Sequence, residues 1–502
     1  MSRFVFFAVV ALSVSVVVGA DWPQWRGPQR DGAASESPTL VSALPEAGLA
    51  PTWLSETLPG GFAGGWGSPI VVEGRVYLFV HHKAQKSPGP LPKRKYPYLA
   101  DDKRGGMSAE EYAKYEENRR AEDIEFGKLY AFQETLVCAD LATGKTVWRT
   151  DTPSVYSRFV QSGTLTYHDG KLYFLGAARH VRCVDAGTGK EIWNVALPGE
   201  FIDEFYMSSV LVADGAAVAF AGKLFGLDAA DGKLLWDGTD KMKGQHSSAV
   251  AWNAAGKTLA IANVGGGETI CVEPRTGKEL WRVKSEANNS TPVVAGDRLI
   301  TYGSSRRSGL RCFKLNSADV AATPEELWNY QRIGDKGSSP VVVGKHVYVQ
   351  GEKRLACVEL ESGDEAWSAN LDLASPQYTS LVAADDKVIY AYDGLICFVA
   401  DPAEFRSLAE VKFNKVGLMA TEDAHRKLLK LDEVEKQPNG LEESTKIYKR
   451  EVGDQGPLPC ASPAIVDGRL ILRLRDKIAC YDLRAGAMPS GATPAATTTS
   501  SK

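Results

Sequence analysis

Polar and aromatic side chains that could hold a ligand recur along the chain, in short segments that precede predicted β-strands. They offer aromatic surfaces for stacking, cations for acidic groups, and carboxylate, amide and imidazole groups for hydrogen bonds or metal ions. The residues are Trp66, Arg158, Gln161, Glu204, Tyr206, Gln245, His246, Asn288, Asn289, Asp335, Lys336, Gln377 and Tyr378. If these segments converge in space, the residues surround one small concave binding site.

An internal repeat would position these residues. The segment LVCADLATGKTVW ends at Trp148 and returns with substitutions along most of the chain. Clear copies end at Trp193, Trp236, Trp281 and Trp367, weaker ones surround Cys312 and Cys397, and the last contains Cys480. The period is close to the roughly 40–45 residues of a propeller blade.

Each repeat contains two predicted β-hairpins. The first joins two apolar runs through a short Gly/Asp turn, as in SSPVVVGKHVYVQG, and the second turns through T-G-K or D-G-K and ends in Trp. Four strands without a helix between them form one antiparallel blade, so eight copies predict an all-β, eight-bladed β-propeller. The last copy lacks its outer strand. We expect the N-terminal strand around Trp53 to complete it and close the ring.

The regions outside the repeats define the expected domain organisation. Residues 1–20 have the basic start, apolar stretch and small-residue cleavage site of a signal peptide. An N-terminal arm (21–48) should lie ordered against the propeller (49–484), which carries insertions at about 81–133 and 413–459. A capping-box pattern at Ser108 predicts a helix in the first insertion, and AHRKLLKLDEV predicts one in the second. The Ala/Thr/Ser-rich tail (485–502) is expected to be disordered.

Composition limits the partners of the protein. The net charge of −4 shows no excess of basic residues for nucleic acid. No stretch after the signal peptide has the length and apolar character of a membrane span. We therefore expect a periplasmic or secreted monomer, whose partner would be an envelope protein or a glycan.

The cysteines and tryptophans follow the repeat. Cys138, Cys183, Cys271, Cys312, Cys357, Cys397 and Cys480 occupy one slot of seven repeats, and Gly226 fills that slot in the eighth. Equivalent slots of a ring cannot face one another as a disulfide requires, so we expect buried free thiols. Cys460 is off the pattern and could be exposed. The repeated Trp residues indicate packing between blades.

Other short motifs give no catalytic assignment. The GKT at Gly144–Thr146 lacks the earlier glycine of a phosphate-binding loop and precedes a strand, so it is a turn. The pair His81-His82 would need further ligands to bind a metal. The sequence contains no C-x-x-C-H, H-E-x-x-H or D-x-D-x-D-G motif.

The repeated pattern Cys/Ala-x-Asp-x-x-Thr-Gly-x-x-x-Trp resembles the tryptophan-docking repeat of the pyrroloquinoline-quinone (PQQ)-type propellers. That superfamily includes quinoprotein alcohol dehydrogenases and the propeller lipoprotein of the outer-membrane β-barrel assembly machine. The arm, with its W-P-Q-W-R-G-P motif, looks like that of exported PQQ-like proteins of planctomycete bacteria. The resemblance covers about residues 53–484 and implies the fold.

The resemblance leaves two functional hypotheses. The first is a non-catalytic envelope scaffold or binding protein without a cofactor, which uses the axial loops and the insertions. The alternative is a PQQ-dependent dehydrogenase with calcium, in which Trp66 is the floor of the quinone slot and Arg158 and Lys336 bind its carboxylates. Glu204 with Asn288 or Asn289 would then bind the metal. The adjacent Cys-Cys pair of the dehydrogenases is absent, which favours the first hypothesis.

Overall fold

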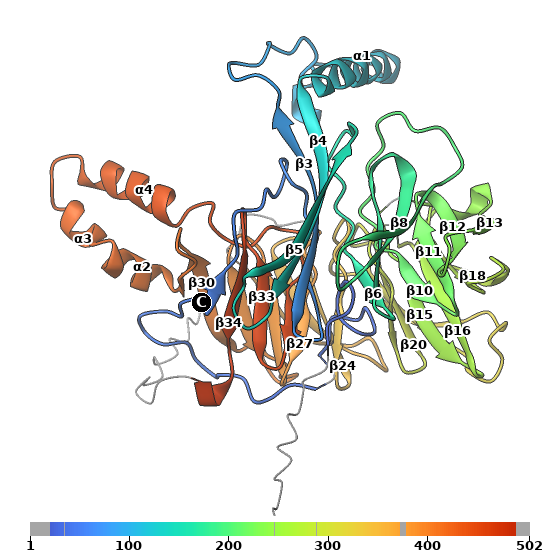
Figure 1. The fold of residues 1–502 in the computed structure, drawn as a ribbon. Helices are drawn as coiled ribbons and strands as arrows, with labels where there is room; N and C mark the ends of the chain where they lie inside the picture. Colours follow the sequence, from blue (N-terminus) through green and yellow to red (C-terminus); the bar gives the residue numbers. More distant parts are fainter. Residues whose placement is uncertain (1–20, 35, 245, 288, 372–377, 488–502) are drawn as a thin grey trace, which may run out of the picture.

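The strands form eight antiparallel sheets around one axis, in a computed structural model that describes residues 21–34, 36–244, 246–287, 289–371 and 378–487 (Figure 1). Within each sheet the strands follow one another in chain order, and the short first strand lies innermost. The predicted eight-bladed propeller of four-stranded antiparallel blades is therefore confirmed.

The first four blades run from residue 70 to residue 284. Blade 1 contains β2 (Ile70–Val72), β3 (Arg75–Gln85), β4 (Tyr130–Asp140) and β5 (Thr146–Ser154). Blade 2 contains β6 (Thr166–His168), β7 (Lys171–Leu175), β8 (His180–Asp185) and β9 (Glu191–Ala196). Blade 3 contains β10 (Leu211–Ala213), β11 (Ala216–Phe220), β12 (Gly222–Asp228) and β13 (Leu234–Asp237), with β14 (Lys243–Gly244) also paired to β12. Blade 4 contains β15 (Val250–Ala254), β16 (Lys257–Val264), β17 (Glu268–Val272) and β18 (Glu279–Lys284).

The other four blades complete the ring. Blade 5 contains β19 (Val293–Ala295), β20 (Arg298–Tyr302), β21 (Leu310–Lys314) and β22 (Glu325–Tyr330). Blade 6 contains β23 (Val341–Val343), β24 (His346–Gly351), β25 (Arg354–Glu359) and β26 (Glu365–Asn370). Blade 7 contains β27 (Val382–Ala384), β28 (Lys387–Ala391), β29 (Leu395–Val399), β30 (Ser407–Phe413) and the short β31 (Met419–Ala420). Blade 8 contains β32 (Ala464–Val466), β33 (Arg469–Arg473) and β34 (Ile478–Asp482).

The outer strand of blade 8 comes from the other end of the chain. Strand β1 (Trp53–Leu54) pairs antiparallel with β34, placing Trp53 opposite Cys480 and Leu54 opposite Ala479. This pairing covers an edge that would otherwise be open at the seam. The predicted closure of the ring by the N-terminal strand is confirmed.

Each docking tryptophan joins its blade to the next one. The indole Nε1 of Trp148 donates to the carbonyl of Ala186 at 3.0 Å, and that of Trp193 donates to Ala229 at 3.1 Å. A Cβ added to the turn glycine Gly189 would lie 2.6 Å from the Trp148 ring, and its φ of +71° also favours glycine. The Trp ring of one repeat thus packs directly on the turn glycine of the next repeat.

Trp281 is the exception to this hydrogen bond among the described docking tryptophans, whereas Trp367 donates to the carbonyl of Asp401 at 2.8 Å although residues 400–406 also lack glycine. The segment of blade 5 that would receive Trp281, residues 315–324, contains no glycine. The Trp281 Nε1 is buried without a hydrogen-bond partner among the described residues. Its ring instead packs against Trp252, with 6.4 Å between centroids.

The repeat-slot cysteines lie beside these tryptophans within each blade. Cys138 is opposite Trp148, Cys183 is opposite Trp193 and Cys357 is opposite Trp367. The seven slot cysteines are free thiols, as the repeat predicts. In the eighth slot, a Cβ on Gly226 would lie 2.1 Å from the Trp236 ring, so only glycine fits.

We expect these thiols to resist alkylation in the native protein and to react once it unfolds. Burial raises the pKa of Cys138 and Cys183 to about 11 and that of Cys312 to about 12, so little thiolate forms near neutral pH. Mass spectrometry after iodoacetamide treatment, with and without denaturant and never with reductant, tests this. Two or more disulfides in the unreduced protein would contradict the assignment.

Two insertions leave the propeller at the same end. Strands β3 and β4 stay paired out to Gln85 and Tyr130, beyond which lies helix α1 (Ala109–Gly127), at the top of Figure 1. Its predicted capping box is present, with reciprocal hydrogen bonds between Ser108 and Glu111. Blade 7 leads into α2 (Glu422–Leu428), α3 (Leu431–Val434) and α4 (Gly440–Glu451), which project to one side. None of the helices in the described ranges is long and apolar enough to span a membrane.

Candidate functional site

Eight loops lead into the innermost strands of the blades, and we call them the mouth loops. A four-stranded antiparallel blade returns the chain to the end at which it began, so all eight lie on one face. Their described residues are 55–69, 155–165, 197–210, 238–244, 246–249, 285–287, 289–292, 331–340, 371, 378–381 and 453–463. The described residues that were predicted to bind a ligand lie in these loops.

A series of hydroxyl groups links the mouth loops to one another, interrupted between blades 7 and 8, where Ser462 Oγ has no hydrogen-bond partner among the described residues. The backbone N–H of Ser68 donates to Thr164 Oγ1 at 3.1 Å, and that of Thr164 donates to Ser209 Oγ at 3.0 Å. The pattern continues through Ser248, Thr291, Ser339 and Ser380. The N–H of Ser462 donates to Ser68 Oγ at 2.9 Å, which links blade 8 to blade 1. These bonds satisfy backbone donors where the loops enter the channel and thereby hold its width.

The N-terminal arm runs through the central channel. Trp22 exchanges backbone hydrogen bonds of 2.7 and 2.9 Å with Val71 of blade 1. Ala383 of blade 7 accepts from Ala34 and donates to Gly32, both at 2.8 Å. The segment between these contacts therefore crosses the channel at the level of the innermost strands. The sequence predicted an arm against the propeller and did not place it inside.

Two arginines of the arm are completely buried in the channel. Arg30 donates to the carbonyls of Ser209, Val210 and Ala249, on the side of blades 3 and 4. Arg26 donates to the carbonyl of Pro340, on the side of blades 6 and 7. Burial lowers the pKa of Arg26 to about 10 and that of Arg30 to about 9, so both remain charged at neutral pH. Together they fasten the arm across the axis.

Above the arm the channel forms a cavity of about 330 Å³, which we call the cup. Trp25 of the arm lines it together with side chains of the mouth loops, so the arm closes the channel below the mouth. The aromatic lining residues are Trp25, Phe62, Trp66, Phe159, Phe205, His246 and Tyr378. Several contact one another edge to face or stacked, with 4.8 Å between the centroids of Phe159 and Phe205 and 5.1 Å between those of Phe205 and His246.

The other described residues of the cup wall carry no charged side chain. The polar ones are Ser68, Ser162, Thr164, Ser248 and Asn289, and Met207, Gly337 and Cys460 complete the lining. Burial lowers the pKa of His246 to about 4, so its imidazole is neutral at physiological pH. At the rim, Phe62 is 70% exposed, Tyr378 is 41% exposed and Phe159 is 38% exposed. Large exposed aromatic groups around a concavity are typical of a binding surface.

The predicted site residues fall into three groups. Those that line the cup are Trp66, His246, Asn289 and Tyr378. Those on the mouth loops but outside its lining are Arg158, Gln161, Glu204, Tyr206, Asp335 and Lys336. Gln245, Asn288 and Gln377 lie outside the described residues.

Residues of the second group mostly hold the loops in place. Gln161 accepts from the N–H of Tyr206 at 2.7 Å and donates to the carbonyl of Glu204 at 3.2 Å. The carboxylate of Asp335 accepts from the backbone of Ser338 and Tyr378, at 2.7 and 3.1 Å, and so joins two mouth loops. Lys336 is exposed.

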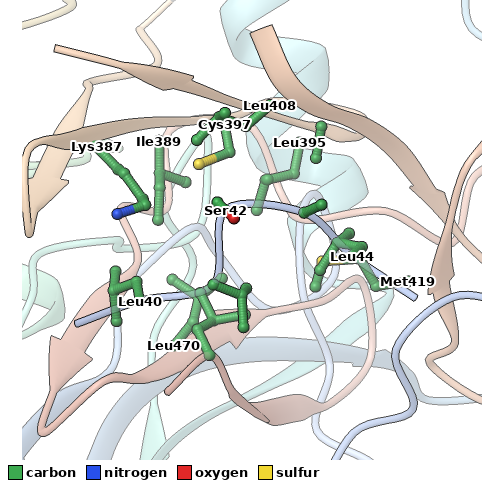
Figure 2. Close-up of a pocket in the computed structure, with 14 residues that line it drawn as sticks. Leu40, Ser42, Leu44, Lys387, Ile389, Leu395, Cys397, Leu408, Met419 and Leu470 are labelled. Carbon is green, nitrogen blue, oxygen red and sulfur yellow. The ribbon is translucent and has the colours of Figure 1, made fainter. Parts of the chain in front are cut away.

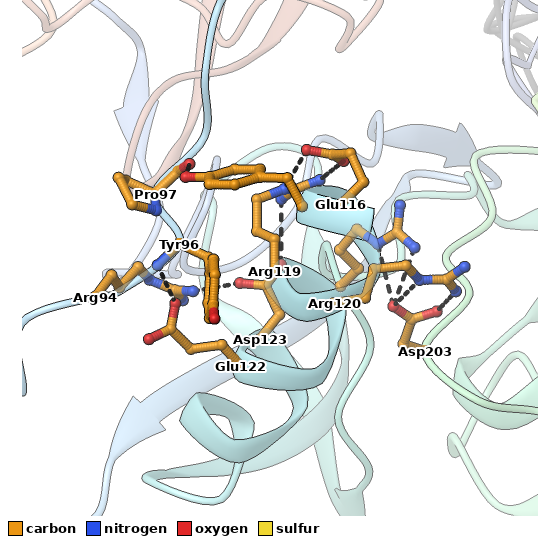
Figure 3. Close-up of polar contacts among 11 residues, drawn as sticks. Arg94, Tyr96, Pro97, Glu116, Arg119, Arg120, Glu122, Asp123 and Asp203 are labelled. Atoms are coloured by element: carbon orange, nitrogen blue, oxygen red, sulfur yellow. Dashed lines mark hydrogen bonds and ion pairs between the residues drawn. The ribbon is translucent and has the colours of Figure 1, made fainter. Parts of the chain in front are cut away.

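Arg158 shares the carboxylate of Asp203 with Arg120 of the first insertion; Figure 3 shows the contact between Arg120 and Asp203. The Arg158 Nε donates to Asp203 at 3.1 Å, and Arg120 of α1 binds the same buried carboxylate. Burial raises the pKa of Asp203, but the hydrogen bonds from Arg120 and Arg158 outweigh burial and leave that pKa below its usual value. Asp203 thus anchors helix α1 above the mouth loops.

Replacing Asp203 with asparagine should release α1. Removing the charge leaves Arg120 and Arg158 without their counter-ion, so trypsin should cut at Arg119 and Arg120 about tenfold faster while the propeller stays folded. Because the folded-state pKa is depressed, the anchor is intact above the unfolded value near 4 and is lost as pH falls through the folded value. Asp151→Asn, at an exposed ion pair, is the control. Equal cleavage of both variants would contradict the anchor.

The sequence did not identify most of the aromatic wall. Phe62, Phe159 and Phe205 lie in segments that were identified as mouth loops, but polar residues were selected there. A phenylalanine six to eight residues before each of three successive innermost strands was the available signal. Trp25 carried no such signal, because only the fold shows that the arm enters the channel.

Comparison with known proteins assigns the family. The family model described as "Outer membrane protein assembly factor BamB" matches residues 133–369 and 221–412, which together cover more than half of the chain. The chain belongs to this family. The BamB of Nitrosomonas eutropha (strain DSM 101675 / C91 / Nm57) is 26% identical over 248 residues, which are 45% of this chain and 54% of that protein. The chain thus spans about half the length of this curated relative.

Solved structures show the same fold at low identity to this BamB-family chain. The quinohemoprotein alcohol dehydrogenase ADHIIG of Pseudomonas putida HK5 aligns with a TM-score of 0.54 at 12% identity, over 96% of this chain and 83% of the other. A europium-containing methanol dehydrogenase aligns with a TM-score of 0.51 at 12% identity, over 93% and 98% of the two chains. The resemblance to PQQ-type propellers is confirmed at the level of family and fold.

The cup of this BamB-family propeller does not fit a quinone with acidic groups. The described residues of its wall include no Lys, Arg, Asp or Glu. Arg158 is engaged by Asp203, Arg26 and Arg30 are engaged by backbone carbonyls, and Lys336 is exposed outside the lining. Calcium requires six to eight oxygen ligands, and in the described part of the chain no three His, Cys, Asp or Glu side chains converge as such a site would require.

A second concavity lies between the arm and blades 7 and 8 (Figure 2). It is lined mostly by aliphatic side chains, among them Leu40, Leu44, Ile389 and Leu470, and holds only about 30 Å³. That is the volume of one water molecule. We assign it to packing of the arm, whose backbone is tied here by Leu40 N to Asp385 at 2.7 Å.

Proposed function

We propose that this protein is an exported, non-catalytic binding propeller of the cell envelope, which receives a ligand or partner in the cup. The observation that carries the proposal is the cup itself: an uncharged, aromatic-walled cavity, closed below by the arm and rimmed by exposed Phe62 and Tyr378. Burial shifts the pKa of two titratable residues of this wall away from neutral pH, to about 4 for His246 and about 12 for Cys460, so we assign the cup to binding rather than to acid–base or nucleophilic catalysis. The signal peptide expected at residues 1–20 supplies the export route.

The family supports a binding role. The curated relative is named an outer membrane protein assembly factor, and assembly requires surfaces rather than catalysis. The first insertion adds such a surface beside the mouth. A groove of about 540 Å³ between α1 and the neighbouring loops is lined by Ile124, Tyr130, Phe132, Val155 and Ile202. We propose that partners reach the cup from this face.

The binding role can be tested on envelope fractions of the organism that produces the protein. Immobilised wild type should retain a component that the double variant Phe62→Ser/Phe159→Ser does not, because the variant removes two exposed rim aromatics without touching the blade interiors. Tyr98→Ser, at a residue that is 69% exposed on the first insertion, is the matched control and should retain it. Equal retention by wild type and the double variant would reject the cup as the binding site.

The dehydrogenase alternative predicts that the protein binds PQQ and oxidises an alcohol. We expect neither tight quinone binding nor alcohol-dependent dye reduction when PQQ and calcium are added to the purified protein, because none of the described residues that line the cup is a cation that could bind the quinone carboxylates. Isothermal calorimetry measures the binding directly. A submicromolar quinone site that is lost in Trp66→Ala would make the enzyme assignment the better one.

A further inference from the structure

The wall of the cup combines aromatic rings with neutral hydrogen-bonding groups. Phe62, Trp66, Phe159, Phe205 and His246 form a continuous series of ring contacts. Asn289 and the short hydroxyl side chains supply neutral polar groups in the same cavity. A ligand that fits this wall has an apolar face and several hydroxyl or amide groups.

The polar groups of the cup have hydrogen-bonding capacity left over. Ser68, Thr164 and Ser248 each accept a backbone N–H through the hydroxyl oxygen. A hydroxyl also carries one donor, which remains for a ligand. His246 Nδ1 is buried without a partner among the described residues, although its imidazole is neutral. A buried polar atom without a partner destabilises the unliganded site, so a ligand that supplies the partner is favoured.

The described residues that line the cup carry no charge, which argues against a charged ligand. An acidic or basic ligand would lose its hydration in the cup without gaining a counter-ion. A peptide segment in a blind cavity of about 330 Å³ would bring backbone N–H and C=O groups that this largely aromatic wall cannot all pair. A pyranose ring has an apolar C–H face that can stack on the aromatic rings of the wall. Its hydroxyls can form hydrogen bonds with the neutral polar groups of the wall.

We propose that the cup binds the end of an uncharged oligosaccharide, with one sugar ring against Trp66 and its neighbours and the hydroxyls facing Asn289 and His246. This rests on the proposed binding role of the cup and names its ligand class. Because the arm closes the lower end of the cup, the site takes a chain end rather than the middle of a chain.

The test uses the intrinsic fluorescence of the full-length protein, since Trp25 and Trp66 both line the cup. Maltotriose, cellotriose and N-acetylated chitotriose are the neutral probes, trigalacturonic acid is the charged one, and blocked acetyl-Ala-Phe-Ala-amide represents a protein partner. At least one neutral trisaccharide should give a saturable change that calorimetry reproduces. The charged sugar and the peptide should not.

Two substitutions assign the binding to the cup. Asn289→Ala and Trp66→Ala should each weaken the binding of that trisaccharide at least tenfold, whereas Tyr98→Ala, on the insertion, should leave it unchanged. Thermal unfolding of each variant shows that it is folded. If Trp66→Ala unfolds, Asn289→Ala decides, because it removes only a polar group of the wall.

The outcomes separate this inference from the proposed function. Saturable binding of the peptide or of trigalacturonic acid in place of a neutral sugar overturns the ligand class. So does the absence of binding by every neutral probe. If an envelope component is still retained in a manner that depends on Phe62 and Phe159, the binding role stands without the sugar. If neither retention nor saccharide binding depends on the cup, both proposals fail.

Discussion

Replacing Trp53 with alanine is expected to lower the free energy of unfolding by about 3–5 kcal/mol, the usual cost of deleting a buried tryptophan side chain. The side chain is only 8% exposed, and its Nε1 donates to the carbonyl of Leu141 at 2.8 Å. Its ring also lies on the turn glycine Gly144, where an added Cβ would be 2.5 Å away. The Trp53 side chain therefore connects blade 8 to blade 1, and its removal weakens the contact between these two blades at the seam.

Urea unfolding followed by circular dichroism measures the effect. Trp53→Phe keeps most of the packing and loses one hydrogen bond, so it should cost only about 1 kcal/mol. Tyr98→Ala, at an exposed aromatic of the insertion, should change the stability by less than about 0.5 kcal/mol. A Trp53→Ala protein as stable as the wild type would show that the strand at residues 53–54 does not close the ring in solution.

The fold could be predicted because its rules are local and repeated. The Gly and Trp of the repeat specify the turn and the contact between blades, and Cys138 and its equivalents mark the same interior slot each time. The exception at Trp281 was not predicted, although the repeat that receives it is one of the weak copies and has no glycine at residues 315–324. Because the pattern recurs in eight blades, the clear copies allow the weak copies to be recognised as blades as well.

The site could not be predicted in the same way, because it depends on the positions of segments that do not repeat, namely the N-terminal arm and the individual mouth loops. Arg26 and Arg30 stand in a short polar segment rich in Gly and Pro, which would ordinarily be assigned to the surface. They are buried because carbonyls from opposite sides of the channel accept their hydrogen bonds, and those carbonyls belong to blades far away in sequence. Arg158 and Asp335 lie on the predicted loops, but bonds to Asp203 and to neighbouring backbone occupy them.

The arm also determines the chemistry of the cup. Without it, the ring of blades would enclose an open channel in which backbone carbonyls such as those of Ser209 and Ala249 face the axis without donors. The arm pairs those carbonyls with guanidinium groups and brings Trp25 into the cavity wall. The positive charge is confined beneath the cup, and the ligand side of the channel stays neutral.

Arg30→Met is therefore expected to release the arm and to destabilise the protein by on the order of 3 kcal/mol. The substitution leaves the buried carbonyls of Ser209 and Ala249 without their donor, and each unsatisfied group costs about 1–3 kcal/mol, not additively. The carbonyl of Val210 keeps a second donor, the hydroxyl of Thr166 at 2.6 Å. Arg30→Lys keeps the charge but not the planar set of donors, so it should fall between wild type and Arg30→Met. Arg149→Met, at an exposed ion pair, is the control and should stay within about 0.5 kcal/mol.

Two measurements on the Arg30 variants separate loss of the arm from general unfolding. Trypsin should cut the folded Arg30→Met protein at Arg26, which is fully buried in the wild type, before it degrades the blades. The emission of Trp22 and Trp25 should move toward that of exposed indole, since both leave the channel with the arm. If Arg26 stays protected and stability is unchanged, carbonyl pairing by Arg30 does not hold the arm. The arm's backbone contacts with Val71 and Ala383 would then be what closes the cup.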